Sequence, residues 1–192
     1  MIDALRGILA QRTRRVLERP DRAAVLVPII DDGGPPRLLL TRRTEDLPSH
    51  QGQVAFPGGF VRPDDRDPIR TALRESEEEI GLPASAVEIL GTLDDLPTKD
   101  DRVAVTPVVG RIGVLPALRP QPGEVARIFS IPLASLMDRA RWTSRVEPAP
   151  SGPRQVHLFV HEGETLWGLS ARIVLRLLDL TPAGSPAPPG DP

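Results

Sequence analysis

Residues 58–82 read GGFVRPDDRDPIRTALRESEEEIGL, and this stretch determines how the rest of the chain is interpreted. Asp67 is a good N-cap, Pro68 suits the first helical position, and Gly81 is a typical C-terminal stop. The segment therefore predicts a helix over residues 68–80. The predicted helix carries a run of carboxylates and follows a pair of glycines.

The carboxylates of this helix fall on two sides. With an advance of about 100° per residue, Glu75, Glu78 and Glu79 share one face, while Glu77 points away. A separate arc faces the core and contains Ile69, Ala72, Leu73, Ser76 and Ile80. Like charges at this spacing repel, and the helix dipole disfavours anions in the last turn. The cluster therefore favours a hard cation such as Mg²⁺ or Mn²⁺, although a run of Glu is also typical of a solvated helix face.

The loop before the helix, Phe56-Pro57-Gly58-Gly59, follows an expected strand. Glycine permits close approach of the backbone, so carbonyls or amides of such a loop can face a ligand. A plain tight turn is the alternative interpretation. The combination of this loop with the carboxylate helix favours a ligand site.

Loop and helix together resemble the Nudix hydrolase motif, G-x5-E-x7-R-E-U-x-E-E-x-G-U, in which U is aliphatic. The matching residues are Gly59, Arg74, Glu75, Glu78, Glu79, Gly81 and Leu82. Asp65 stands where the family has its first Glu, and one extra residue then precedes Arg74. Ser76 occupies the aliphatic position inside the helix.

A second resemblance, to the coenzyme A pyrophosphatase branch, covers residues 39–59. The pattern L-L-T-x-R-S/A-x3-R-x3-G-x3-F-P-G-G is matched by Leu39, Leu40, Thr41, Arg43, Gly52 and the segment 56–59. Thr44 replaces the usual Ser or Ala, and Pro48 replaces an Arg. Glu124-Val125 and Trp167-Gly168 are similar to later segments of that branch.

The resemblance implies an α/β (α+β) fold, the Nudix-type α/β/α sandwich, in which helices enclose a mixed sheet. It also implies that coenzyme A or an acyl-CoA is split into 3′,5′-ADP and 4′-phosphopantetheine or its acyl form. Mg²⁺ or Mn²⁺ would bind Glu75 and Glu79, helped by Glu78 and the Gly59 carbonyl. Glu78, Glu79 and Arg74 would form the catalytic group, in which Arg74 pairs with a carboxylate and orients it.

The base that activates water is then one of these Glu residues or a Glu beyond the motif. Arg43, Gly58, Gly52 and Phe56 are the expected substrate-binding residues. Two other functions stay open: hydrolysis of ADP-ribose, NADH or a dinucleoside polyphosphate, and nucleotide binding without catalysis. Intact carboxylates at the three motif positions count against the second.

Hydrophobic periodicity predicts the remaining elements. A helical segment is expected over residues 1–21, the hydrolase domain over 22–180, and a disordered Pro-rich tail over 181–192. Strands are expected at 23–30, 37–42, 53–56, 87–93, 103–112 and 155–161, and further helices at 132–139 and 169–180. Strands mixed irregularly with few helices also favour a layered α/β or α+β domain.

Composition limits the function further. A net charge of −2 and 3% aromatic residues indicate no nucleic-acid partner, and the absence of Cys excludes disulfides and thiolate metal sites. No apolar run is long enough to span a bilayer, so a cytoplasmic protein acting on a small diphosphate is expected. Whether the chain forms a homodimer is left open by the sequence. His157 and His161 are interpreted as structural, and His50 as an exposed loop residue.

Overall fold

The computed structural model describes residues 1–46, 51–148 and 153–181. The predictions for Pro48, for His50 and for the tail beyond Thr181 therefore lie outside the described residues. Among the described residues, no helix is long and apolar enough to cross a membrane.

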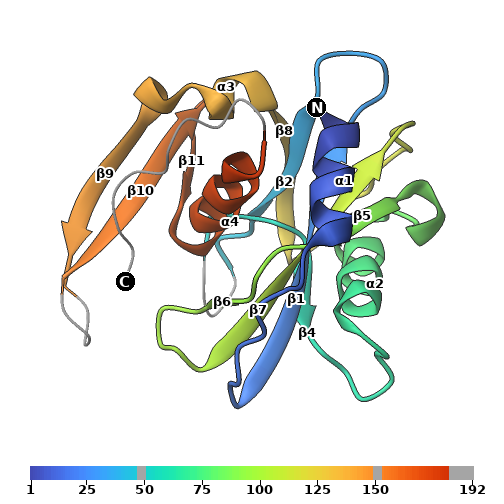
Figure 1. Ribbon diagram of the computed structural model, residues 1–192, viewed down its shortest axis with the longest axis horizontal. Coiled ribbons are helices and arrows are strands. Elements are labelled where there is room, and N and C mark those ends of the chain that lie inside the picture. The colour runs from blue at the N-terminus through green and yellow to red at the C-terminus, as the bar shows by residue number, and fades with distance from the viewer. Residues whose placement is uncertain (47–50, 149–152, 182–192) are drawn as a thin grey trace.

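The centre of the fold is a pair of long parallel strands, β1 (Asp21–Ile30) and β7 (Val103–Ile112), which pair over their whole length. In the described part of the chain these two strands belong to an eight-stranded mixed sheet (Figure 1). Five of its strands lie in the order β3-β2-β1-β7-β5. Of the other three, β4 pairs with β1, β6 with β7, and β8 with β2. The remaining bounds are β2 (Arg37–Arg43), β3 (Val54–Ala55), β4 (Gly58–Phe60), β5 (Glu88–Thr92), β6 (Leu96–Pro97) and β8 (Val125–Pro132).

A smaller antiparallel sheet follows in the chain, in the order β11-β10-β9. Its strands are β9 (Trp142–Glu147), β10 (Arg154–His161) and β11 (Glu164–Trp167). It packs beside helix α4 (Gly168–Asp179), and the short helix α3 (Leu133–Met137) connects β8 to it (Figure 1).

Helices cover both faces of the large sheet because successive β1 side chains point to opposite sides. Leu26 and Ile30 pack with residues of α2 (Pro68–Ile80), whereas Val27 and Ile29 pack with residues of α4 and of α1 (Ile2–Gln11). The result is the expected Nudix-type α/β/α sandwich, so the predicted fold class is confirmed.

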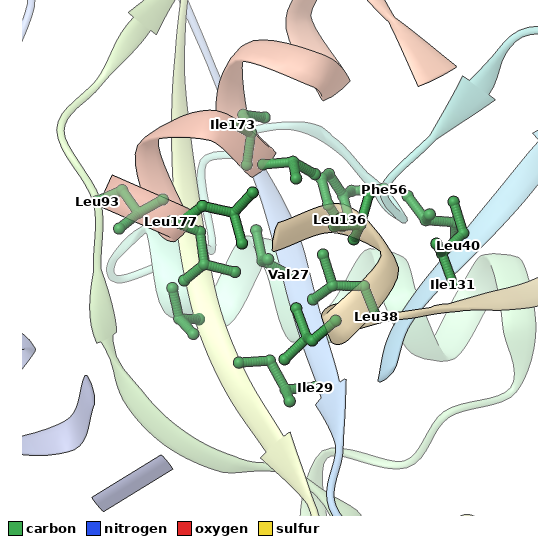
Figure 2. Packing of buried hydrophobic residues seen from close by; sticks show 14 of the residues in the cluster. Val27, Ile29, Leu38, Leu40, Phe56, Leu93, Ile131, Leu136, Ile173 and Leu177 are labelled. Atoms are coloured by element: carbon green, nitrogen blue, oxygen red, sulfur yellow. The ribbon is translucent and has the colours of Figure 1, made fainter. Parts of the chain in front are cut away.

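The larger of the two hydrophobic clusters lies between the sheet and α4. Figure 2 shows Ile173 and Leu177 of α4 directed at Val27 of β1, and Leu40 of β2 beside Ile131 of β8. This cluster fixes β2 against β1, and β2 ends at the edge of the sheet where the carboxylate helix also ends.

Helix α2 has the predicted ends. The Asp67 side chain accepts a hydrogen bond from the Arg70 amide at 2.8 Å, Pro68 opens the helix, and Gly81 closes it with φ +66°. The buried face of the helix packs on the sheet through Ala72, Ser76 and Ile80, which are all fully buried. The Ser76 hydroxyl donates to the Ala72 carbonyl at 2.7 Å, so a polar residue at the aliphatic position is satisfied within the helix.

The N-terminal segment differs from its expected form. The helix ends at Gln11, and the chain then runs without helix or strand to Pro20. Two carboxylates hold this part: Asp94 accepts hydrogen bonds from Arg12 and from the Arg15 amide, both at 2.9 Å, and buried Asp95 accepts one from the Leu17 amide at 3.0 Å. The division of the chain at residue 21 stays a prediction.

Candidate active site

Glu79 is the most buried carboxylate of the helix, with 6% of its surface exposed. Its Oε2 accepts a hydrogen bond from the Gly58 amide at 3.2 Å, and Nη1 of Arg43 lies 4.0 Å from its Oε1. Burial raises the pKa of Glu79 to about 7; Gly58 and Arg43 oppose the shift, and nearby Glu75 and Glu124 add to it. Negative charge is therefore in excess around a carboxylate that has little water to solvate it.

Glu75 lies directly against the glycine loop. A Cβ atom at Gly59 would lie 2.6 Å from Cδ of Glu75, so any other residue at this position would displace that carboxylate. Gly58 meets a different constraint, since a Cβ there would lie 2.6 Å from Cα of Val25 in β1. The first glycine thus makes room for the sheet, and the second makes room for a carboxylate of the site.

Arg74 connects the helix to the loop. Its guanidinium donates to Asp65 at 2.8 and 3.2 Å, to Glu75 at 2.6 Å and to the Phe60 carbonyl at 3.2 Å. Asp65 also accepts hydrogen bonds from the Thr71 hydroxyl and the Arg62 amide, each at 3.0 Å. These contacts hold the pKa of Asp65 far below and that of Arg74 well above their usual ranges. The expected pairing of Arg74 with a carboxylate is present.

Glu78 is held in an ion pair with Arg62. Both of its oxygens accept hydrogen bonds from the guanidinium of Arg62, at 2.8 and 2.9 Å, and this contact lowers the pKa of Glu78. Arg62 belongs to the loop between the glycines and the helix, and nothing in the motif spacing indicated it. Arg74 also reaches Glu78, at 3.4 Å, so Glu75 and Glu78 share this arginine, while Glu79 is held by the Gly58 amide.

The expected substrate-binding residues occupy different environments. Arg43 lies at the end of β2, and its Nε is buried without a hydrogen-bond partner among the described residues. Gly52 adopts φ +62° in a turn, and its amide donates to the Thr44 carbonyl at 3.3 Å. The Gly58 amide donates a hydrogen bond to the Glu79 carboxylate, so this glycine contacts a residue of the site.

Phe56 requires a correction. Its side chain is 4% exposed and packs in the cluster under α4, where Figure 2 shows it near Leu136 and Leu40. A ring in that position anchors the loop to the core and presents no surface to a substrate. The hydrophobic effect, rather than ligand contact, accounts for Phe at this position.

The donor set suits a hard divalent cation, because carboxylate and carbonyl oxygens are the ligands that Mg²⁺ and Mn²⁺ prefer. Within the described ranges, no three His, Asp or Glu side chains already converge as a metal site. Arg62 and Arg74 hold Glu78 and Glu75 in ion pairs instead. The crowded, buried Glu79 carboxylate and the room left by Gly59 nevertheless fit a bound cation, which would compensate the excess negative charge.

An apolar groove of about 560 Å³ lies elsewhere on the α2 face of the sheet. It is lined by Ile30, Arg37, Leu39, Leu115, Pro116, Leu118, Pro120, Ile128, Phe129 and Ser130. Arg37, its charged lining residue, is already paired with Asp32 at 2.8 Å. The groove therefore offers neither a free cation nor a cluster of metal-binding oxygens for a diphosphate, whereas the carboxylate cluster offers such oxygens.

A mixed sheet between helices, with a carboxylate helix closing on a glycine loop, defines a Nudix-type hydrolase. The chain belongs to the Nudix family: the family model described as NUDIX domain matches residues 20–150. Enzymes of this family generally use divalent metal ions and act on small nucleotide substrates.

Curated relatives agree with this assignment. The chain is 45% identical over 159 residues to a protein of Yersinia pestis (strain Pestoides F) described as "Uncharacterized Nudix hydrolase NudL", covering 81% of this chain and 77% of the relative. Among solved structures, a MutT/nudix family protein from Enterococcus faecalis superposes with a TM-score of 0.55 at 16% identity, over 90% of this chain and 66% of that one. The Nudix hydrolase RenU of M. smegmatis gives 0.51 at 21% identity, over 64% and 76%. These two structures support the fold alone.

Proposed function

We propose that this Nudix hydrolase cleaves the diphosphate of coenzyme A or an acyl-CoA, releasing 3′,5′-ADP and 4′-phosphopantetheine or its acyl form. The observation that carries the proposal is the position of Arg43, the arginine of the coenzyme A signature. Its Nη1 lies 4.0 Å from the Glu79 carboxylate, and its buried Nε has no partner among the described residues. A guanidinium so placed supports binding of a substrate phosphate beside the carboxylates.

Glu75 and Glu79, with Glu78 and the Gly59 carbonyl, would hold the metal ions. Bound Mg²⁺ or Mn²⁺ would supply charge neutralisation on the non-bridging phosphate oxygens and a site for the attacking water. Arg62 and Arg74 must release Glu78 and part of Glu75 for this role. The Arg62–Glu78 pair is 53% and 42% exposed, whereas the Arg74–Glu75 pair is only 12% and 14% exposed. Arg74 then keeps the helix in place through Asp65.

The proton of the attacking water needs a carboxylate acceptor close to the site. Glu79 is one candidate, and Glu124 is a candidate beyond the motif, because it lies close enough to raise the pKa of Glu79. Glu124 follows a turn that is tied to β2, where its carbonyl accepts a hydrogen bond from the Thr44 amide at 3.0 Å. This tie keeps Glu124 at the same edge of the sheet as Arg43.

A substrate panel tests the proposal. Coenzyme A, dephospho-coenzyme A, ADP-ribose and NADH are each incubated with the protein and Mg²⁺ or Mn²⁺, and products are separated chromatographically. We expect kcat/KM to be highest for coenzyme A or its thioesters. Cleavage of ADP-ribose without cleavage of coenzyme A would refute the substrate and keep the reaction class.

The cytoplasmic location and the question of a homodimer remain predictions from the sequence. Size-exclusion chromatography with light scattering on the full chain decides the second.

A further inference from the structure

Two arginines face each other across the edge of the sheet next to the active site. Arg42 of β2 and Arg127 of β8 are direct cross-strand partners, and their side chains are 42% and 49% exposed. Like charges directly opposite each other in a sheet are destabilising. A pair of this kind calls for an explanation in terms of what lies between the two guanidinium groups.

A single buried carboxylate lies between them. Glu164 of β11 is 8% exposed, with Oε1 at 3.1 Å from Nη1 of Arg127 and 3.9 Å from Nη1 of Arg42. Arg127 also lies over the ring of Phe129, 5.5 Å from its centroid. The two arginines therefore share one negative charge, to which Arg127 donates a hydrogen bond and from which Arg42 lies 3.9 Å away.

The remaining partner of Arg42 is weakly bound. Nη2 of Arg42 lies 2.9 Å from Oε1 of Glu45, whose side chain is 66% exposed. Exposed pairs of this kind contribute about 0–1 kcal/mol. A doubly charged phosphate group would displace Glu45 easily, whereas the buried Glu164 would remain.

The pair lies at the same edge as the catalytic carboxylates. Arg43 pairs with Val125 at the last position of β2, so both strands reach the edge together. Arg42 and Arg43 are consecutive, and the pairing of β2 with β8 shifts register between them, from Arg127 to Val125. The arginine pair is therefore one residue along β2 from Arg43, which lies beside Glu79.

We propose that Arg42 and Arg127 bind a phosphomonoester of the substrate, namely the 3′-phosphate of coenzyme A. This inference rests on the proposed function. The two guanidinium groups carry one positive charge more than the buried Glu164 balances, and guanidinium N–H groups that are not held by Glu164 can donate to phosphate oxygens.

Substrate discrimination tests the inference. In Arg127→Gln and Arg42→Gln, kcat/KM for coenzyme A should fall at least about tenfold, the scale of a lost charge-assisted hydrogen bond, while that for dephospho-coenzyme A changes less than about twofold. Arg145→Gln is the matched control, since Arg145 is 57% exposed on β9 and paired with Glu147. An equal fall for both substrates, or no fall for either, would overturn the inference.

Loss of Arg127 leaves the buried Glu164 with less compensation, so the double variant Arg127→Gln/Glu164→Gln guards against misfolding. Calorimetry with the metal-free full chain provides a measurement without turnover. We expect 3′,5′-ADP to bind at least about tenfold more tightly than 5′-AMP, and the double variant to lose this preference. Equal binding of the two nucleotides to the unaltered protein would overturn the inference, whereas failure to cleave any coenzyme A compound would refute the proposed function by itself.

Discussion

The guanidinium of Arg74 donates two hydrogen bonds to the carboxylate of Asp65, from Nη2 to Oδ2 at 2.8 Å and from Nε to Oδ1 at 3.2 Å. Their side chains are 12% and 3% exposed. Since Arg74 also binds Glu75, the shorter Asp at the position of the family's first Glu acts on the site through an arginine. Its role is to hold the loop, the helix and Glu75 in one arrangement.

Asp65→Asn should destabilise the fold by about 3 kcal/mol, because it leaves Arg74 with one buried partner fewer. The pKa of Asp65 is strongly depressed by Arg74, so its contribution is present above the ordinary pKa of 3.8 and is lost only as the pH falls well below it. Urea unfolding at neutral pH measures the loss. Asp64→Asn, one residue earlier and exposed, is the control, and equal stability of the two variants would contradict the role of Asp65.

The two glycines should fail in different ways. Gly59→Ala meets the end of the flexible Glu75 side chain, so we expect near-normal stability and a large loss of activity. Gly58→Ala meets the backbone of β1, so we expect a loss of stability of a few kcal/mol, the scale of overpacking. Gly113→Ala, whose Cβ has no neighbour closer than 3.8 Å, is the control. Thermal unfolding and a diphosphate hydrolysis assay separate the two effects, and an active Gly59→Ala variant would count against Glu75 as a metal ligand.

Glu79→Gln should lower turnover at least about a hundredfold with the fold retained, the scale of losing a group that stabilises transition-state charge. The amide keeps the shape of the side chain and removes its charge. Glu77→Gln, exposed on the far side of the helix, should be nearly silent. Steady-state kinetics with saturating Mg²⁺ measures both. Normal turnover in the Glu79→Gln variant would contradict the assignment of Glu79 as a metal ligand.

The raised pKa of Glu79 predicts a pH dependence of stability without metal. The folded state binds this proton more tightly than the unfolded chain, so stability falls as the pH rises from the ordinary 4.5 to about 7, and the penalty remains above pH 7. Glu79→Gln should therefore be more stable than the unaltered protein at pH 8, by at most about 3 kcal/mol, and similar to it below pH 4.5. Urea unfolding of both proteins in the presence of a chelator, at both pH values, tests this. A stability difference between the two proteins that does not change with pH would show that it does not come from titration of Glu79.

Much of the fold could be predicted because its decisive signals are local. The caps at Asp67 and Gly81 define α2 without reference to any other segment, and the apolar run of β7 has the predicted bounds, Val103–Ile112. The short strands β4 and β6 were not predicted, nor were β8, β9 and β11. The last three have charged or half-exposed residues along most of their length. Their strand form comes from pairing with distant segments, which periodicity does not report.

The site divides in the same way. Helical geometry placed Glu75, Glu78 and Glu79 on one face, and Arg74 was expected to pair with a carboxylate. The choice of partners was not predictable, because Arg62 reaches Glu78 only after the loop folds back along the helix. Phe56 was misassigned for a related reason, since a signature position does not reveal whether its side chain points to the core or to a ligand.

The parallel pairing of β1 with β7 has a consequence for biosynthesis. Val103, the partner of Asp21, leaves the ribosome 82 residues later, and Arg12 likewise waits 82 residues for Asp94. At about 5–20 residues per second, the first strand is without its central neighbour for roughly 4–16 s. Helix α2 packs on β1 in the folded chain and leaves the ribosome before β7, so the carboxylate helix is available to cover one apolar face of β1 during that interval.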